Sequence, residues 1–226
     1  MAFSKEMLDF LVENKLRNDR PWYNERKEEF TKKVLMPLQE LVGKLTPLMK
    51  EIDPLFEVSP KVDKTISRVY RDTRFTHDKS LFRDVMWIVF KRMKHLGDEG
   101  VPGFWFEIGP NGAVYGMGSY DPPKEFLEEM RKRILAKDPL FLKAKKMFES
   151  QQIFTLDGER FKRSKHPEQP EEIKFWIDRK NVSLMAKSKD FQLLLSDQLA
   201  AKLEADFRLI QPMYEFWKSV EENRPK

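Results

Sequence analysis

The strongest constraint on the fold is a hairpin signal near the middle of the chain. Two short runs rich in aromatic and apolar residues, 104–108 and 113–119, flank Gly109-Pro110-Asn111-Gly112. Asn-Gly between two strand-like runs is a strong short-range signal for a tight β-hairpin. The sequence therefore predicts an antiparallel pair of strands in the middle third, around which the other elements must be arranged.

Other strand-like runs lie on both sides of this hairpin. Residues 85–90 are apolar, include β-branched and aromatic side chains, and are bracketed by Asp84 and Lys91. That composition favours a short buried strand. Three further runs predict short strands: 66–70, 152–156 and 182–186.

The first third of the chain has helical periodicity. Ser4 can cap a first helix, which Asn18-Asp19-Arg20-Pro21 ends. Apolar residues then recur at steps of three and four as far as Ile52. Pro37 and Pro47 each remove a backbone donor, so we expect a kink or a break at both positions.

The last third is helical again. Pro122-Pro123 precedes one helix, Asp138-Pro139 opens the next, and Ser196 begins a long final helix that we expect to break near Gln211-Pro212. Helices at both ends with antiparallel strands between them are typical of the α+β class rather than of alternating βαβ units. We therefore predict a single α+β domain over residues 1–226, with a central antiparallel sheet that includes the hairpin, flanked by helices from both ends.

Composition excludes several classes of protein. The chain has 226 residues and is 40% hydrophobic, with 18 Phe, which is atypical of a disordered chain. No apolar run is long enough to span a membrane, and the charged start does not resemble a secretory signal. The lack of cysteine excludes disulfides and thiolate chemistry. We expect a soluble, cytoplasmic protein with no membrane partner.

The densest chemical feature is the segment 68–83, called the arginine-rich segment below. It carries five strongly basic side chains, opposed only by Asp72 and Asp78. A guanidinium group matches a phosphate or a carboxylate bidentately, and interleaved aromatic rings can stack on a ligand or anchor the segment to the core. We predict that this segment binds a small anionic ligand. The predicted ligand-binding residues are Arg68, Tyr70, Arg71, Arg74, Lys79 and Arg83.

Two other interpretations of this segment stay open. An enzyme acting on a phosphorylated or acidic substrate would use the arginines to stabilise negative charge, and Asp72 or His77 to move protons. An interaction protein would use the Arg-Asp pairs only to hold an irregular loop. We rank anion binding first, the enzyme second and the interaction protein third.

The same segment resembles a known family, domain of unknown function 2461, a mostly bacterial group with no established activity. The family pattern R-x-Y-R-D-x-R-F-x-x-D-K-x-P-Y-K is matched by Arg68, Tyr70, Arg71, Asp72, Arg74, Phe75, Asp78 and Lys79. The match departs at Leu81, Phe82 and Arg83, which stand where Pro, Tyr and Lys are usual. Phe82 lacks the hydroxyl of that Tyr, which removes one proton donor. The resemblance implies an α+β fold and a cytoplasmic location, and it implies no activity.

Weaker signals lie elsewhere. His77, His95 and His166 are isolated and lack metal-ligand spacing, so we predict no metal site and no cofactor. Residues 160–165 hold four bases, but no recognised nucleic-acid motif accompanies them, so nucleic acid is only an alternative partner. The sequence makes no prediction about oligomeric state.

Overall fold

The computed structural model describes residues 3–74, 77–93, 101–119 and 121–224. Its strands form one antiparallel sheet in the order β1-β2-β3-β5-β4. The strands are β1 (Met86–Phe90), β2 (Gly103–Gly109), β3 (Gly112–Ser119), β4 (Thr155–Asp157) and β5 (Val182–Ser188). Helices come before and after the strands in the chain, so the predicted α+β class with a central antiparallel sheet is confirmed.

The predicted hairpin is formed by β2 and β3, which only Pro110 and Asn111 separate. Gly112 has a φ of 115°, in the region that L side chains rarely adopt, so the Asn-Gly pair supplies the residue that this turn requires. The strands predicted at 85–90 and 182–186 are confirmed as β1 and β5.

The prediction of a strand at residues 66–70 is wrong. This stretch contributes only isolated bridges, between Ile66 and Ile88 and between Tyr70 and Phe82. Four residue steps separate Ile66 from Tyr70, whereas six separate Phe82 from Ile88. The two extra residues on one side act as a bulge, which bends the chain and interrupts the ladder before a regular strand forms.

Helices from the N-terminal third begin as the sequence predicts. The Ser4 side chain accepts a hydrogen bond from Met7 N at 3.3 Å, and Asn18 ends the first helix in the left-handed conformation with a φ of 51°. Asp19 then caps the next helix through Trp22 N at 3.3 Å. The elements are α1 (Lys5–Arg17), α2 (Arg20–Glu25), α3 (Lys27–Phe30), the π-helical η1 (Thr31–Leu35) and α4 (Met36–Ile52).

The remaining helices follow the hairpin. They are α5 (Lys124–Leu135), α6 (Pro139–Glu149), α7 (Glu171–Ile177), α8 (Phe191–Leu194) and α9 (Leu199–Asn223). The α6 helix begins at Asp138-Pro139 as predicted, with Asp138 as its cap, whereas the sequence does not predict the short helices α7 and α8. No helix in the described part of the chain combines the length and the apolar character that crossing a membrane requires.

Prolines interrupt the helices less than expected. Pro37 lies in the first turn of α4, directly after η1, where a missing donor is tolerated. Pro47 and Pro212 lie inside uninterrupted helices, so the break predicted near Gln211-Pro212 is wrong. Buried side chains lie on both sides of Pro212, including Ile210 and Met213, and their packing offsets the lost backbone hydrogen bond.

The chain divides into two compact units. Unit 1 comprises Met1–Phe90, Trp105–Tyr115 and Lys187–Glu204, and unit 2 comprises Lys91–Phe104, Gly116–Ala186 and Ala205–Lys226. Each unit has its own buried aromatic contacts. Phe3 stacks on Phe106 in unit 1, with ring centroids 6.0 Å apart, and Phe104 meets Phe207 edge-on in unit 2 at 5.2 Å. The prediction of a single domain over residues 1–226 stays a prediction.

Candidate functional site

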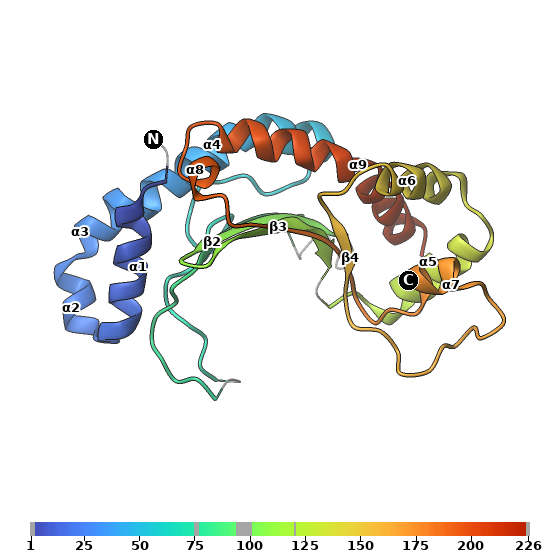
Figure 1. Ribbon diagram of the computed structural model, residues 1–226, viewed down its shortest axis with the longest axis horizontal. Helices are drawn as coiled ribbons and strands as arrows, with labels where there is room; N and C mark the ends of the chain where they lie inside the picture. Colours follow the sequence, from blue (N-terminus) through green and yellow to red (C-terminus); the bar gives the residue numbers. More distant parts are fainter. Residues whose placement is uncertain (1–2, 75–76, 94–100, 120, 225–226) are drawn as a thin grey trace. The chain divides into compact units, whose positions relative to one another are not determined.

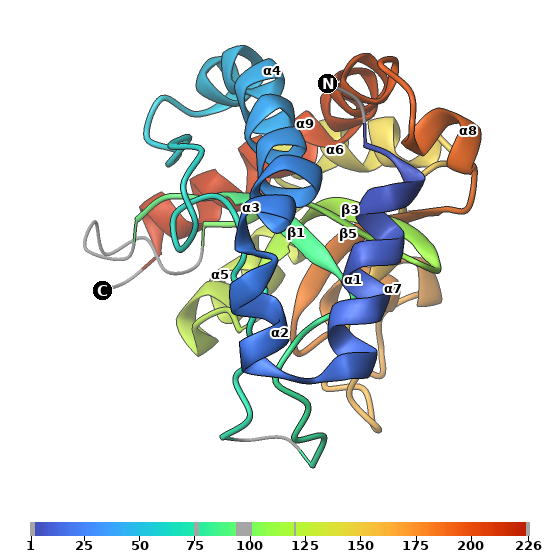
Figure 2. The same ribbon diagram turned by 90° about the vertical axis from the view of Figure 1, so that its left-hand side faces the viewer.

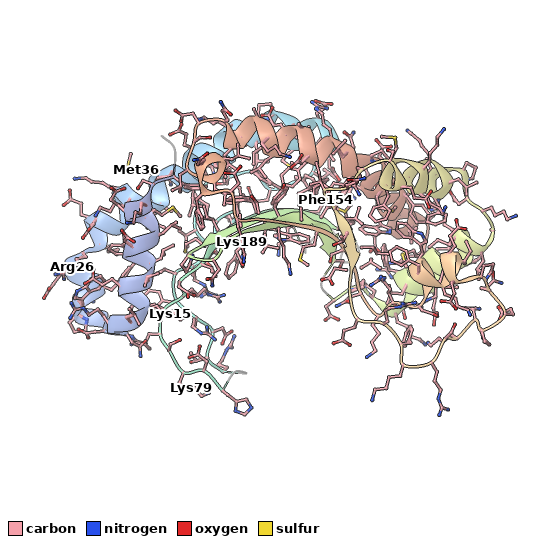
Figure 3. The ribbon with its side chains drawn as sticks, viewed as in Figure 1. Lys15, Arg26, Met36, Lys79, Phe154 and Lys189 are labelled. Atoms are coloured by element: carbon pink, nitrogen blue, oxygen red, sulfur yellow. The ribbon has the colours of Figure 1, made fainter. Side chains whose placement is uncertain are left out.

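The arginine-rich segment lies in unit 1, beside the connection between α1 and α2. Figures 1 and 2 show it as part of the teal stretch that runs past the lower ends of these helices. Asn18 Oδ1 accepts a hydrogen bond from Leu81 N at 2.6 Å. Lys15, on the side of α1 that faces this stretch in Figure 3, forms an ion pair with Asp84 at 2.8 Å. Both contacts fasten the end of the segment to α1.

Backbone pairing brings the two ends of the segment together. Arg71 N donates to Leu81 O at 2.8 Å, and Arg83 N donates to Val69 O at 2.9 Å. With the bridge between Tyr70 and Phe82, these bonds make the segment an irregular hairpin. The pairing brings Arg83 close in space to arginines that precede it by more than ten positions in the chain.

Aromatic rings anchor this irregular hairpin to α2. The Tyr70 ring lies 5.5 Å from that of Tyr23 and 5.0 Å from that of Phe82, measured between centroids. Phe82 is fully buried and Tyr23 nearly so. Burial of Tyr23, and to a lesser extent the nearby Tyr70, raises the pKa of Tyr23 to about 12. The contacts of Tyr70 are those of an anchor, although 37% of the residue remains exposed.

Three arginines of the segment are paired with carboxylates. Arg74 binds Asp72 bidentately, with Nε–Oδ1 at 2.9 Å and Nη2–Oδ2 at 2.7 Å. The hydrogen bonds from the Arg74 side chain and backbone hold the pKa of Asp72 well below its ordinary value. Arg68 Nε lies 2.9 Å from Asp63 Oδ1. All these side chains are at least 40% exposed, so the pairs order the loop more than they stabilise the fold.

Arg71 is only partly satisfied. Its Nη1 lies 3.1 Å from Asp78 Oδ2, but its buried Nε has no hydrogen-bond partner. The pKa of Asp78 is lowered, chiefly by the backbone N–H of Ser80 and only secondarily by Arg71. Arg71 therefore keeps one donor without a partner in a position closed to solvent, while other atoms of the residue line an open pocket on the segment.

Arg83 is held in place without a carboxylate. Its Nε donates to Tyr70 O at 3.2 Å, and its guanidinium carbon lies 4.4 Å from the centroid of the Trp87 ring. Within the described residues Arg83 forms no ion pair, and its two terminal nitrogens have no acceptor. Burial lowers the pKa of Arg83, and the positive charges of Arg71 and Arg68 lower it further. The negative charges of Glu107 and Asp72 oppose this lowering without contacting Arg83.

The remaining predicted residues lie at the tip of the segment. Lys79 Nζ donates to Thr73 O at 2.8 Å, and Figure 3 shows Lys79 at the outer end of the teal stretch. His77 is exposed and has no hydrogen-bond partner among the residues that the structure describes. An open pocket on this segment is lined by Arg68, Tyr70, Arg71, Asp72, Thr73 and Arg74. The lining thus includes four of the six predicted ligand-binding residues and Asp72, and it leaves out Arg83, Lys79 and His77. Phe75 of the family pattern lies outside the described residues.

Sequence reasoning missed Glu107. This half-buried carboxylate lies on β2, and burial raises its pKa, while the positive charge of Arg83 opposes that shift. Its electrostatic interaction with Arg83 adds an acidic residue to the arginine cluster. The available signal was a lone acidic residue in the otherwise apolar run Phe104-Trp105-Phe106-Glu107-Ile108.

No cluster of three or more potential metal ligands is found in the described ranges. The geometry instead defines an α+β protein with an arginine-rich hairpin anchored by aromatic rings. Comparison with protein families is consistent with this class: the model described as "Conserved hypothetical protein (DUF2461)" matches residues 6–216. The chain therefore belongs to the DUF2461 family, and the resemblance found in the arginine-rich segment is confirmed. No curated protein and no solved structure matches the chain.

Proposed function

We propose that the arginine-rich segment binds a small anionic ligand, a phosphate- or carboxylate-bearing molecule, through Arg83 and Arg71. The observation that carries this proposal is the state of Arg83, whose terminal nitrogens form no hydrogen bond or ion pair within the described residues. A guanidinium held by a carbonyl and an aromatic ring presents a fixed fork to a ligand. Arg68 adds positive charge nearby.

The ion pairs of the segment support this proposal by ordering the binding residues. Asp72 and Arg74 close the turn, and Lys79 ties the tip to Thr73. A loop that is ordered before binding pays less conformational entropy when the ligand arrives. Tyr70 contributes its carbonyl oxygen, which positions Arg83, and Arg74 and Lys79 contribute mainly to the shape of the loop.

A titration with two matched variants tests the proposal. Inorganic phosphate and acetate are titrated into the wild-type protein, Arg83→Gln and Arg74→Gln, and binding is followed by calorimetry and by the melting temperature. Loss of a charge-assisted hydrogen bond predicts at least about tenfold weaker binding for Arg83→Gln. Arg74→Gln removes the same charge, but from an arginine that is already bound to Asp72. The affinity of this variant for the anions should therefore change by less than about threefold.

Two results would overturn this proposal. If neither phosphate nor acetate binds at tens of millimolar, there is no anion site. If Arg74→Gln and Arg83→Gln weaken binding equally, the effect is one of general electrostatics. Citrate and pyrophosphate extend the titration to larger acids, because Arg68, Arg71 and Arg74 line one open pocket on the segment.

An enzyme acting on an acidic substrate is the second candidate. Its support is Glu107, a half-buried carboxylate with a raised pKa beside Arg83, the kind of pairing that is enriched at active sites. Asp72 is a poorer proton carrier, because Arg74 holds its carboxyl ionised. His77 has no orienting partner in the described residues. Third comes an interaction protein in which the Arg-Asp pairs serve only the fold.

Location and macromolecular partners are part of the same proposal. We propose a cytoplasmic protein, in keeping with a chain that has no cysteine. Nucleic acid ranks below the small anion. In unit 2, Phe161 lies under Lys165 at 4.6 Å and under Arg131 at 5.4 Å, which gives two cations near the basic stretch 160–165 a packing role. A salt-dependent shift of a labelled oligonucleotide would restore nucleic acid as a partner.

A further inference from the structure

We infer that Glu107 is the second half of the anion site, and that the ligand therefore carries a hydroxyl or an ammonium group next to its anionic group. This inference rests on the proposed function of Arg83 and Arg71. It adds a recognition element from β2 that the arginine-rich segment does not contain, and it narrows the ligand from any small anion to one with an adjacent hydrogen-bond donor.

Strand register places Glu107 beside Trp87. Gly109 of β2 lies so close to Val85 that a Cβ atom on the glycine would collide with the valine side chain. β1 and β2 are antiparallel neighbours, so stepping two residues inward from this pair sets Glu107 opposite Trp87. Alternate residues of β2, Phe106 and Ile108, are fully buried in the core, so Glu107 lies on the other face of the sheet.

Arg83 approaches the same point from outside the sheet. Its guanidinium lies over the Trp87 ring at 4.4 Å, and its charge acts on Glu107. Yet Glu107 and Arg83 do not form an ion pair: no nitrogen–oxygen contact within 4.0 Å joins them in the described structure. Two opposite charges therefore flank Trp87, near enough to interact and too far apart to bond.

No positively charged side chain in the described residues contacts the Glu107 carboxylate. Besides Arg83, the charged group that acts on it is Asp84, a like charge that Lys15 already neutralises through an ion pair at 2.8 Å. No hydrogen-bond donor among the described residues reaches the Glu107 carboxylate. The Glu107 oxygens are not among the buried atoms that lack a partner, so they reach solvent and are open to a donor from a ligand.

The chemistry of the two groups defines the ligand. The free terminal nitrogens of Arg83 only donate hydrogen bonds, so they require an anionic acceptor. An ionised Glu107 only accepts, and it would repel that same anionic group. One ligand satisfies both when it presents a phosphate or carboxylate to Arg83 and a donor to Glu107. A hydroxyl or an ammonium one or two carbon atoms from the acidic group meets this requirement.

Three esters of phosphoric acid with a common skeleton test this inference. Ethyl phosphate, 2-hydroxyethyl phosphate and 2-aminoethyl phosphate are titrated at pH 7 into the wild-type protein and into Glu107→Gln. The wild type should bind the hydroxyl and amino compounds roughly three- to tenfold more tightly than ethyl phosphate, the gain typical of one added hydrogen bond. In Glu107→Gln the preference for the ammonium compound should disappear, because a neutral amide attracts a cation poorly. Its affinity for ethyl phosphate should stay equal or rise, because a repulsive charge is lost.

Controls separate this inference from the proposal on which it rests. Glu13→Gln removes a carboxylate from an exposed pair on α1 and should leave all three affinities unchanged. Equal binding of the three esters by the wild type, with Arg83→Gln still weakening each, would overturn the role of Glu107 and leave anion binding intact. Weaker ethyl phosphate binding by Glu107→Gln would also overturn it, because Glu107 would then donate a proton to the anion itself. If none of the esters binds, both proposals fall.

Discussion

Arginine side chains occupy two contrasting environments in this protein. In unit 2, Arg131 and Arg179 are at least 93% buried, and each gives two hydrogen bonds to main-chain carbonyls. Arg131 reaches Ile177 O at 2.9 Å and Arg179 O at 2.6 Å. In unit 1, Arg83 is half-buried and gives one such bond, to Tyr70 O at 3.2 Å.

This difference separates a structural arginine from one that is available to a ligand. Burial lowers the pKa of Arg131 and Arg83 alike, so burial alone does not distinguish them. What differs is how many donors are already used. Arg131 uses its donors to join α5 to the end of α7 and to Arg179 after it, whereas the terminal nitrogens of Arg83 have no acceptor among the described residues.

The largest effect we expect is on stability, from replacing Arg131. Arg131→Met keeps an apolar stem and leaves the carbonyls of Ile177 and Arg179 unsatisfied in a buried place. Two such groups predict a loss of roughly 2–4 kcal/mol in the free energy of unfolding. Arg83→Met should lose at most about 1 kcal/mol, because one bond near the surface is lost. Urea unfolding followed by tryptophan fluorescence measures both, and similar losses for the two variants would refute the distinction.

How far the sequence predicts the fold depends on whether a signal is local. The hairpin, the cap at Ser4 and the helix start at Asp138-Pro139 depend on a few adjacent residues, and all are confirmed. The strand expected at 66–70 failed because a bulge between Phe82 and Ile88 sets its pairing, and no local pattern encodes a bulge in a distant partner. The helix break predicted near Pro212 is wrong because buried neighbours on both sides override the intrinsic preference of proline.

The candidate site was predictable only in part for the same reason. The concentration of arginine in residues 68–83 is visible in the sequence, but which arginines remain unpaired depends on their three-dimensional neighbours. Arg74 is occupied by Asp72, two residues away, whereas Arg83 depends on Tyr70, thirteen residues earlier. Glu107 lies on another element, and only the register of β1 against β2 brings it to Trp87.

An intermediate case sharpens the comparison. Arg71 uses Nη1 on Asp78 and leaves Nε unfilled, so it combines features of both environments. Arg71→Ala should lose about 1 kcal/mol of stability at most, because Asp78 is half exposed. It should also weaken phosphate binding by about tenfold if the proposed site is correct. The two quantities are measured on one preparation by urea unfolding and calorimetry. A variant that fails to fold would favour the interaction protein over the binding site.

The smallest expected effect concerns proton binding within the arginine-rich segment. Arg74 lowers the pKa of Asp72 mainly through its side chain, whereas Ser80 N–H has the larger part in lowering that of Asp78. Carboxyl carbon NMR titration of Arg74→Gln should therefore show the pKa of Asp72 returning toward the ordinary aspartate range. Arg71→Gln should move the pKa of Asp78 less. The pKa of Asp72 is lower in the folded state than in the unfolded state. The ion pair with Arg74 therefore stabilises the fold at pH values above the ordinary aspartate pKa, and this stabilisation is lost as the pH falls through the lowered pKa. An unchanged Asp72 titration in Arg74→Gln would mean that this arginine is not committed to Asp72, and Arg74 would then join Arg83 among the arginines available to a ligand.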